Sequence, residues 1–371
     1  MNVLIYSTSS GNRSPDQQGQ AELLLTLNHK VFLLTHGKDD VLHKNFRAMG
    51  ATAFSSAHKG GGSLIFLIRQ WAFLIGFCNK HKIQIVFCHG TSNAIIGGLA
   101  KKFVKSKFIY VRHHTDEFVV LRDKKNVLLS KLANRFSDTI IAISKKVKFF
   151  LLEDGVSLKK IFRINLCYNF DECLKTDVQG DPAEIRKSVK ADFLLLSIAR
   201  LVPSKRILAS FDVVKNLREM GHDCGLIVIG SGEMDEELNQ WILKHELQEN
   251  VKLVGYKANV LDYLKAADML IHPSYSEASN QVVKEMGLHK KPVIVCNDVG
   301  DFDDYLINGV NSIIVDKENP IKPMTEAIAS LINDEQKKYS IGNNLYLTVL
   351  STFSISAAKA DYVKLLNVVM S

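Results

Sequence analysis

The sequence lacks any hydrophobic run long enough to cross a membrane. Its longest apolar stretch, residues 64–77, is 14 residues long and contains Arg69, whereas a spanning helix needs about 20 apolar residues. The first residues also lack the basic segment, apolar core and small-residue cleavage site of a secretory signal. We therefore expect a cytoplasmic protein whose only route to a membrane is peripheral binding at the inner face.

Cysteine is sparse and has no recognisable pattern. The six cysteines include no CxxC pair, and their spacing matches neither a zinc site nor a disulfide framework. Isolated cysteines in cytoplasmic proteins are usually reduced and buried. The sequence therefore predicts no metal site, and we expect no cofactor.

Acidic residues are scarce in the first half of the chain. Residues 1–165 contain 25 Lys and Arg but 10 Asp and Glu, whereas residues 166–371 contain 22 and 29. A basic half joined to an acidic half indicates two domains that face different partners. A basic domain favours phosphate, nucleic acid or an anionic membrane surface. Nucleic acid is disfavoured, because its binding needs aromatic platforms beside basic clusters, and the aromatic residues here lie in apolar runs.

The chain of 371 residues has the length of two domains. Short apolar runs alternate with segments of helical spacing, and the alternation starts afresh at Phe193. This pattern predicts two doubly wound α/β domains, each with a parallel sheet covered on both faces, and a cleft between them. The polar stretch between the two series is the best linker candidate. The predicted parts are a first domain at 1–170, a linker at 171–192, a second domain at 193–354 and a helix at 355–371 that would pack back across the junction.

The strongest local signal follows the apolar run MLIHPS. Glu277 and Glu285 stand eight residues apart where a strand gives way to a helix, beside Ser279 and Asn280, which are residue types that begin helices well. The free backbone N–H groups at such a start bind phosphate, and Glu285, about two turns further on, would reach a ribose diol. The alternative is a pair of solvated glutamates on a helix.

Two further signals follow earlier strands of the same half. Arg200 and Lys205 come after the run FLLLSI and offer a guanidinium fork and a point charge for a diphosphate. The alternative for them is a solvated basic turn. The segment Gly230-Ser231-Gly232 permits close backbone approach after the next strand. Because it lacks the third glycine of a dinucleotide-binding GxGxxG, it is weak evidence by itself.

Together these motifs resemble the retaining family 4 glycosyltransferases, which have the GT-B fold of two Rossmann-like domains facing a central cleft. The resemblance rests on the order of the motifs over residues 193–316, and it is fainter earlier, at Ile143-Ser144 and Tyr168-Asn169-Phe170-Asp171. The motifs in order are Arg200…Lys205, Gly230-Ser231-Gly232, Val254-Gly255-Tyr256, Ala267-Asp268, His272-Pro273-Ser274, Glu277-x7-Glu285 and Lys291-Pro292-Val293.

The resemblance implies catalytic roles for five matched residues. Arg200 and Lys205 would hold the donor diphosphate and stabilise the leaving group. Glu277 would contact hydroxyls of the donor sugar. From the first domain, His113 or His114 would also contact that sugar, and the sequence leaves the choice between them open.

The remaining implied contacts bind the nucleotide. Glu285 would bind the ribose, and Tyr256 and Lys257 would lie against the base. Gly230 belongs to the donor-binding loop. The backbone amides around Ser279, Asn280 and Gln281 would cradle the distal phosphate.

The activity that the resemblance implies is metal-independent hexosyl transfer from a nucleotide-sugar, with UDP weakly preferred over GDP. The acceptor would be a sugar or a lipid-linked glycan, in the synthesis of a cell-surface polysaccharide or lipopolysaccharide. Two alternatives are a sugar-nucleotide epimerase of the same fold and a non-catalytic nucleotide-sugar-binding homologue. Asp301-Phe302-Asp303 is a DxD sequence of the kind that binds a metal–nucleotide pair in GT-A enzymes, but it falls where this family has a variable helix start.

Several basic residues of the first half stand beside apolar ones. Lys145, Lys146 and Lys148 precede Phe149, and four lysines cluster between residues 101 and 107. A basic amphipathic face attracts anionic lipid at about 1 kcal/mol per charge. We therefore expect an anionic membrane surface as a partner, with solvated helix faces as the alternative.

Overall fold

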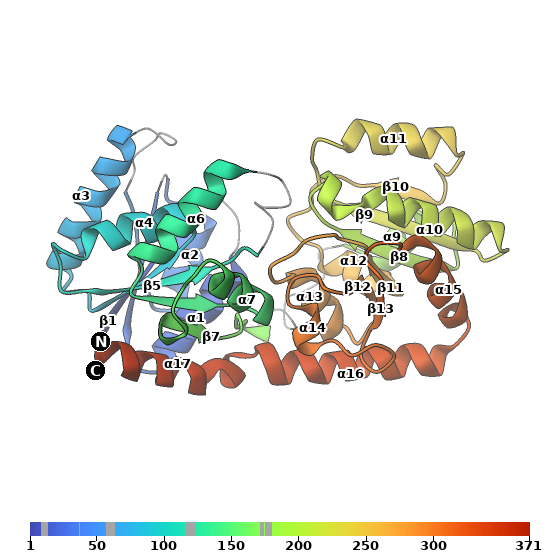
Figure 1. Ribbon diagram of the computed structural model, residues 1–371. Coiled ribbons are helices and arrows are strands. Elements are labelled where there is room, and N and C mark those ends of the chain that lie inside the picture. Colours follow the sequence, from blue (N-terminus) through green and yellow to red (C-terminus); the bar gives the residue numbers. More distant parts are fainter. Residues whose placement is uncertain (9–13, 37, 57–63, 116–122, 171–173, 175–179) are drawn as a thin grey trace. The chain divides into compact units, whose positions relative to one another are not determined.

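The computed structural model describes residues 1–8, 14–36, 38–56, 64–115, 123–170, 174 and 180–371 (Figure 1). The chain forms two compact units, residues 1–169 with 352–371 and residues 170–351. Each unit carries one parallel sheet with helices around it, which confirms the predicted pair of doubly wound α/β domains. Of the predicted linker, residues 171–173 and 175–179 lie outside the described residues, and Pro182–Lys187 forms helix α9 of the second unit.

The first unit has a seven-stranded sheet in the order β3-β2-β1-β4-β5-β6-β7. Its strands are mostly apolar because helices cover both faces, and Val3, Leu4, Ile5 and Tyr6 of the interior strand β1 are completely buried. The strands are β1 (Asn2–Thr8), β2 (Lys30–His36), β3 (Thr52–Ser55), β4 (Ile85–His89), β5 (Lys107–Arg112), β6 (Thr139–Ala142) and β7 (Ile161–Arg163).

Capping side chains mark where several helices of this unit begin. Asp40, Asp123 and Ser144 each accept hydrogen bonds from backbone N–H groups of the first helical turn, which satisfies donors that have no partner within the helix. The helices of the unit are α1 (Pro15–Thr26), α2 (Val41–Ala48), α3 (Leu64–Lys80), α4 (Thr91–Ala100), α6 (Lys124–Phe136), α7 (Lys145–Glu153) and α17 (Ile355–Met370), with a 3-10 turn η1 (Leu158–Lys160).

The second unit has a six-stranded sheet in the order β10-β9-β8-β11-β12-β13. The strands are β8 (Phe193–Ile198), β9 (Cys224–Ile229), β10 (Val251–Leu253), β11 (Met269–His272), β12 (Val293–Cys296) and β13 (Ile313–Val315). The helices after α9 are α10 (Ile207–Glu219), α11 (Asp235–Lys244), α12 (Leu261–Ala266), α13 (Gln281–Leu288), α14 (Phe302–Tyr305), α15 (Ile321–Ile332) and α16 (Glu335–Phe353), with a 3-10 turn η2 (Pro203–Lys205).

Both sheets reverse their strand order beside the first strand of the unit. The reversal lies between β1 and β4 in the first sheet and between β8 and β11 in the second. At such a point the loops that leave the carboxyl ends of the two strands run in opposite directions, and the crevice between them is where doubly wound sheets bind ligands. Each unit therefore has one favoured place for a site.

Helix α17 completes the first unit although it is far from that unit in sequence. It packs on α1 (Figure 1), and its buried Tyr362 accepts a hydrogen bond from the Gln20 amide at 2.9 Å. Gly19 on α1 is needed here, since an added Cβ would lie 2.0 Å from the Cys167 carbonyl oxygen. This close packing fixes α1, whose first turn carries Asp16, a member of a cluster described below.

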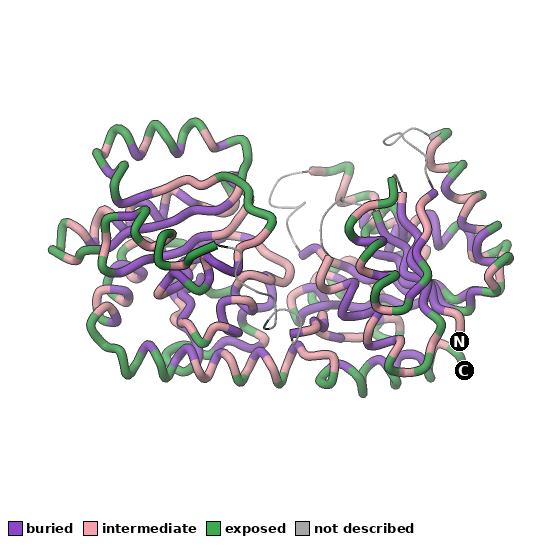
Figure 2. The backbone as a smooth tube through the Cα atoms, turned by 180° about the vertical axis from the view of Figure 1, so that it is seen from behind, coloured by how far each residue is buried: buried purple, intermediate pink, exposed green. Residues whose placement is uncertain are grey.

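Burial follows the layers of each unit. Figure 2 shows buried residues concentrated along the strands, while the outer turns of the helices are exposed. Among the described residues, the structure contains no helix with the length and hydropathy that crossing a membrane requires.

Candidate active site

Lys205 and Glu277 meet at the reversal point of the second sheet. Lys205 ends the turn η2 after β8, and Glu277 follows β11. The Lys205 Nζ lies 2.6 Å from the Glu277 Oε1, and the two side chains are only 11% and 13% exposed. Lys205 also donates to the Ser276 carbonyl at 3.1 Å. Two of the residues that the sequence singles out thus form one buried ion pair at the predicted edge of the sheet.

His272 completes the environment of the Glu277 carboxylate. Its Nε2 lies 2.8 Å from the Glu277 Oε1, and the imidazole is itself buried at the end of β11. Burial alone would raise the pKa of Glu277, but the hydrogen bond and charge of His272 and the charge of Lys205 lower that pKa to about 2. Glu277 is therefore a carboxylate, not a carboxylic acid, at any physiological pH.

The start of α13 lies directly beside this pair. Asn280 caps the helix by accepting from the Val283 N–H at 3.0 Å, as its residue type predicts, and its Nδ2 lies 3.1 Å from the His272 Nε2. Gln281 donates to Glu285 one turn further along the helix. The helix N-terminus and its positive dipole end consequently lie close to Glu277, which suits an anionic ligand.

A second buried ion pair supports helix α13. The Lys284 Nζ lies 2.7 Å from the Asp301 Oδ2, and the two side chains are 1% and 0% exposed. Asp301 also accepts from the Ser279 hydroxyl at 2.7 Å, and burial lowers the pKa of Lys284. The first acid of the DxD sequence is therefore an internal counter-ion of α13, and the Ser279 hydroxyl is engaged by it.

Gly300 allows the loop after β12 to pass against Glu277. It has φ +59°, and a Cβ added there would lie 2.8 Å from the Glu277 Cβ. Glycine alone meets both conditions without strain, because L side chains disfavour this backbone conformation and no space exists for one. The loop at Gly300 thus packs directly against Glu277.

The substitution Gly300→Ala should destabilise the protein by about 1–3 kcal/mol, which is the usual cost of overpacking, and should lower the melting temperature. Gly309→Ala is the matched control, since Gly309 has φ +74° but nothing within 4 Å of an added Cβ. Thermal denaturation of the two variants separates the backbone strain, which both share, from the collision with Glu277. Equal melting temperatures for the two would contradict this account.

Arg200 lies on the same edge of the second sheet. It is an exposed residue shortly after β8, and the loop after β9 holds its backbone. An added Cβ on Gly230 would lie 1.8 Å from the Ala199 carbonyl oxygen, and one on Gly232 2.3 Å from the Leu201 carbonyl oxygen. The two glycines of the GxG segment therefore let this loop pack tightly on the backbone that presents Arg200.

The remaining nucleotide-binding candidates lie on two elements of this unit. Tyr256 and Lys257 are exposed in the loop that follows β10, and the Tyr256 side chain is 61% exposed. Glu285 is half-buried on α13. None of these side chains is part of the Lys205–Glu277–His272 cluster.

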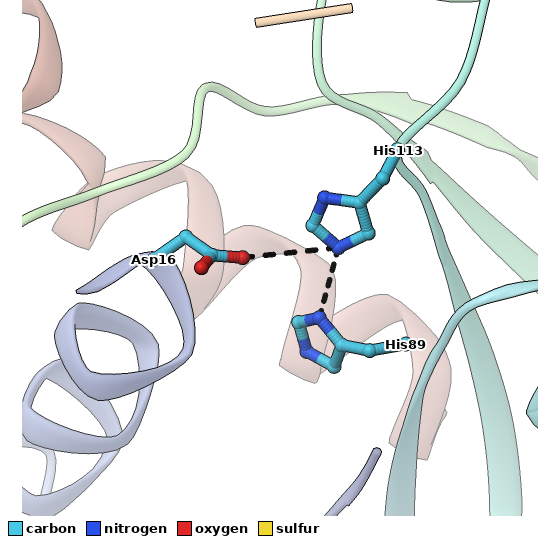
Figure 3. Close-up of side chains that lie close together, drawn as sticks. All are labelled: Asp16, His89 and His113. Atoms are coloured by element: carbon cyan, nitrogen blue, oxygen red, sulfur yellow. Dashed lines mark hydrogen bonds and ion pairs between the residues drawn. The ribbon is translucent and has the colours of Figure 1, made fainter. Parts of the chain in front are cut away.

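In the first unit, His113 lies in a cluster of three ionisable side chains at the reversal point of that sheet (Figure 3). His113 follows β5, and its Nε2 lies 2.9 Å from the Nδ1 of His89 at the end of β4. The Asp16 Oδ2, on the first turn of α1, lies 3.9 Å from the same Nε2. Burial lowers the pKa of both His89 and His113, so both rings are neutral at neutral pH.

His114 has a different environment from its neighbour. It is 8% exposed, and its Nε2 lies 2.9 Å from the Ser130 hydroxyl on α6. Burial, together with the charge of Arg112, lowers its pKa to about 3. The half-exposed His113 is therefore the better candidate for contact with a ligand, and His114 is a packed residue of the interior.

Several residues of these clusters are not predicted as functional from the sequence. The sequence assigns no role to His272, although it lies within a recognised motif, and it does not single out Asp16 or His89. His89 could have been found from its position at the end of an apolar run, because side chains at the carboxyl ends of strands are favoured ligand contacts. The pairing of Lys284 with Asp301 has no local sequence signal.

Two glycosyltransferase families match the chain one after the other. The family described as Glycosyltransferase Family 4 matches residues 20–171, and Glycosyl transferases group 1 matches residues 181–347. The chain belongs to the family 4 glycosyltransferases. The two matches divide this glycosyltransferase into the same two halves as its sheets.

Curated relatives and a solved structure agree with this membership. The chain is 26% identical over 232 residues to the capsular polysaccharide biosynthesis glycosyltransferase CapM of Staphylococcus aureus, covering 61% of this chain and 60% of the relative. It is 24% identical over 270 residues to the Escherichia coli UDP-Gal:α-D-GlcNAc-diphosphoundecaprenol α-1,3-galactosyltransferase, covering 68% and 70%. The structure of Anabaena HepE with UDP-glucose superimposes with a TM-score of 0.82 at 19% identity, over 99% of this chain and all of that chain. That likeness confirms the predicted GT-B fold.

Proposed function

We propose that this glycosyltransferase transfers a hexose from a UDP-sugar to a sugar or lipid-linked glycan acceptor during synthesis of a cell-surface polysaccharide. The observation that carries the proposal is the buried Lys205–Glu277 pair beside the start of α13, at the reversal point of the sheet. The names of the relatives support the donor and acceptor classes. One relative acts in capsular polysaccharide synthesis, and another uses UDP-Gal and a lipid-diphosphate-linked sugar.

In this proposal, Lys205 and Arg200 stabilise the departing nucleoside diphosphate. An ammonium group has three N–H donors, and Glu277 and the Ser276 carbonyl take two from Lys205. A fixed positive charge in a buried site stabilises developing negative charge at little reorganisation cost. The transfer itself then needs no metal ion at the diphosphate, because the cationic side chains replace it.

Glu277 acts in this scheme as a hydrogen-bond acceptor for hydroxyls of the donor sugar. Its pKa of about 2 makes it a weak base, and Lys205 and His272 already occupy its Oε1. Both properties disfavour the rival role of covalent nucleophile. Retention would then follow from front-face attack, in which the acceptor hydroxyl approaches from the leaving-group side and a diphosphate oxygen takes its proton. Trapping of a glycosyl–enzyme bond at Glu277 would overturn this assignment.

The donor is tested by thermal shift with UDP-, GDP- and ADP-sugars at equal concentrations. A ligand that binds only the folded state raises the free energy of unfolding, by about 2.7 kcal/mol at a ligand concentration of a hundred times its Kd. The melting temperature rises accordingly. We expect a UDP-sugar to give the largest shift and UDP to be released faster when a lipid-diphosphate-linked sugar is added. Release of UDP that is independent of acceptor, with an epimerised sugar as product, would favour the epimerase. Binding without turnover would favour the non-catalytic homologue.

We also propose that the first unit binds an anionic membrane surface through the outer face of α7. Positions 145, 148, 149 and 152 share one face of that helix, because residues three and four apart are neighbours. Phe149 and Leu152 are 56% and 42% exposed, and Lys145 is exposed beside them. Exposed apolar side chains next to lysines are typical of helices that lie in a membrane interface.

The substitution Phe149→Ser should weaken binding to vesicles of anionic phospholipid by about tenfold or more, since burying a Phe side chain contributes about 1.5–3 kcal/mol. Co-sedimentation at low and high salt measures the binding, which salt should weaken. Leu243→Ser is the matched control, because Leu243 is 60% exposed on α11 of the second unit. Failure of the unmodified protein to sediment with anionic vesicles at low salt would reject the membrane proposal and leave the donor proposal untouched.

A further inference from the structure

We propose that Asp16, His89 and His113 form a binding site for a divalent transition-metal ion of the zinc type. One ligand atom of each residue lies within 4.8 Å of those of the other two (Figure 3). The three residues come from α1, β4 and the segment after β5. Two imidazole nitrogens and one carboxylate oxygen are a ligand set that Zn²⁺ accepts.

The separations between these atoms fit tetrahedral coordination. Ligands at the usual Zn–N and Zn–O distances of about 2.0–2.1 Å stand about 3.3 Å apart in a tetrahedron. The His89–His113 separation is 2.9 Å and the His113–Asp16 separation is 3.9 Å. Small side-chain rotations therefore suffice to place all three atoms around one ion.

A second layer of hydrogen bonds holds His89 in the form that a metal requires. The His89 Nε2 lies 2.8 Å from the Gln20 Oε1, and the Gln20 amide nitrogen donates to the Tyr362 hydroxyl at 2.9 Å. A carboxamide oxygen only accepts, so with Gln20 in this orientation the His89 Nε2 carries the hydrogen and its Nδ1 presents a lone pair to the cluster. Metal-ligating histidines are oriented in this way by an outer partner on the other ring nitrogen.

The cluster can be reached by an arriving ion. The side chains of His113 and Asp16 are 29% and 19% exposed, which gives the ion a path from solvent. With three protein ligands, a fourth position would stay open for water or a ligand oxygen, as in zinc sites that are not purely structural.

A metal ion bound at this site would change the role that His113 can have in sugar binding. A metal ion takes up the Nε2 lone pair, so His113 could no longer serve as a free contact for the donor sugar. This consequence rests on the function proposed above, whereas the metal site itself does not. We expect Zn²⁺ to inhibit sugar transfer by the unmodified protein and to inhibit Asp16→Asn less.

The test is Zn²⁺ titration of the chelator-treated full chain, prepared without a histidine tag, in competition with a chromophoric chelator. We expect one ion per chain, and a visible absorption spectrum typical of tetrahedral cobalt when Co²⁺ replaces Zn²⁺. Asp16→Asn keeps the size of the side chain and should weaken binding by more than the roughly 10–100-fold that loss of an outer partner causes. His89→Gln should do the same.

His29→Ala is the matched control, since His29 precedes β2 in the same unit and contributes to no part of the cluster. Its Zn²⁺ affinity should equal that of the unmodified protein. Absence of stoichiometric Zn²⁺ binding, or equal affinity in the unmodified protein, Asp16→Asn and His89→Gln, would overturn the proposal. Stoichiometric binding that leaves sugar transfer unchanged would support the metal site and remove His113 from the sugar contact.

Discussion

Replacing Lys205 by alanine should lower kcat for sugar transfer by about a hundredfold or more, which is typical of losing a preorganised charge that stabilises a leaving group. The ammonium is fixed by the Glu277 carboxylate at 2.6 Å and by the Ser276 carbonyl at 3.1 Å. It therefore needs no reorientation when the diphosphate departs. Because the charge acts on the transition state more than on the bound donor, the loss should appear mainly in kcat and less in KM.

The control for this experiment is Lys215→Ala. Lys215 lies on α10 of the same unit, its side chain is 40% exposed, and it pairs with Glu219 one turn away. Its removal takes away an equal charge outside the site and should change kcat less than twofold. Lys205→Arg should retain part of the activity, since it keeps the charge but not the shape of an ammonium. Turnover by Lys205→Ala close to that of the unmodified protein would remove Lys205 from the leaving-group site.

The substitution Asp301→Asn should destabilise the second unit by about 3–5 kcal/mol, which is the usual cost of leaving one partner of a buried ion pair without its counter-charge. The Lys284 ammonium is 1% exposed, and Asp301 is its partner at 2.7 Å. Lys284 also donates to the uncharged Ser279 hydroxyl and Asn280 carbonyl, and the charges of Glu277 and Asp304 act on it less strongly than that of Asp301. Urea denaturation monitored by circular dichroism measures the loss as a lower midpoint.

Two variants make this result specific. Asp303→Asn removes the other acid of the DxD sequence, which is exposed and accepts from the Asp298 N–H at 3.0 Å, so its cost should be below about 1 kcal/mol. Lys284→Met combined with Asp301→Leu replaces the pair by apolar groups and should recover most of the stability. A midpoint for Asp301→Asn equal to that of Asp303→Asn would mean that the ion pair does not support α13.

The fold was predictable because its sequence pattern has a direct physical cause. Strands covered on both faces must be apolar throughout, so they appear as short continuous runs between helical segments, as at Phe193–Ile198. Arg200, Lys205 and Glu277 could be singled out for a related reason, since each follows such a run closely. The same uninterrupted apolar pattern gives no basis for choosing between His113 and His114 as the ligand contact. A strand without polar alternation does not show which face of the sheet each residue takes.

The cluster of Asp16, His89 and His113 could not be predicted in this way. Its formation depends on β1 and β4 being neighbours, and the order of runs along a chain does not say which strands pair. Gly300 raises a different difficulty, since its positive φ and its contact with Glu277 arise from the path of a loop. Local propensity describes neither which strands adjoin nor how loops pass one another.

The return of the chain to the first unit sets an order for folding during synthesis. Tyr362, Leu365 and Leu366 of α17 are buried in that unit, yet they leave the ribosome only after the whole of residues 170–351. Domains generally fold as units once their residues are available. The second unit is therefore free to fold first, whereas Gln20 and Phe87 of the first unit lack their contacts with Tyr362 until the last helix emerges.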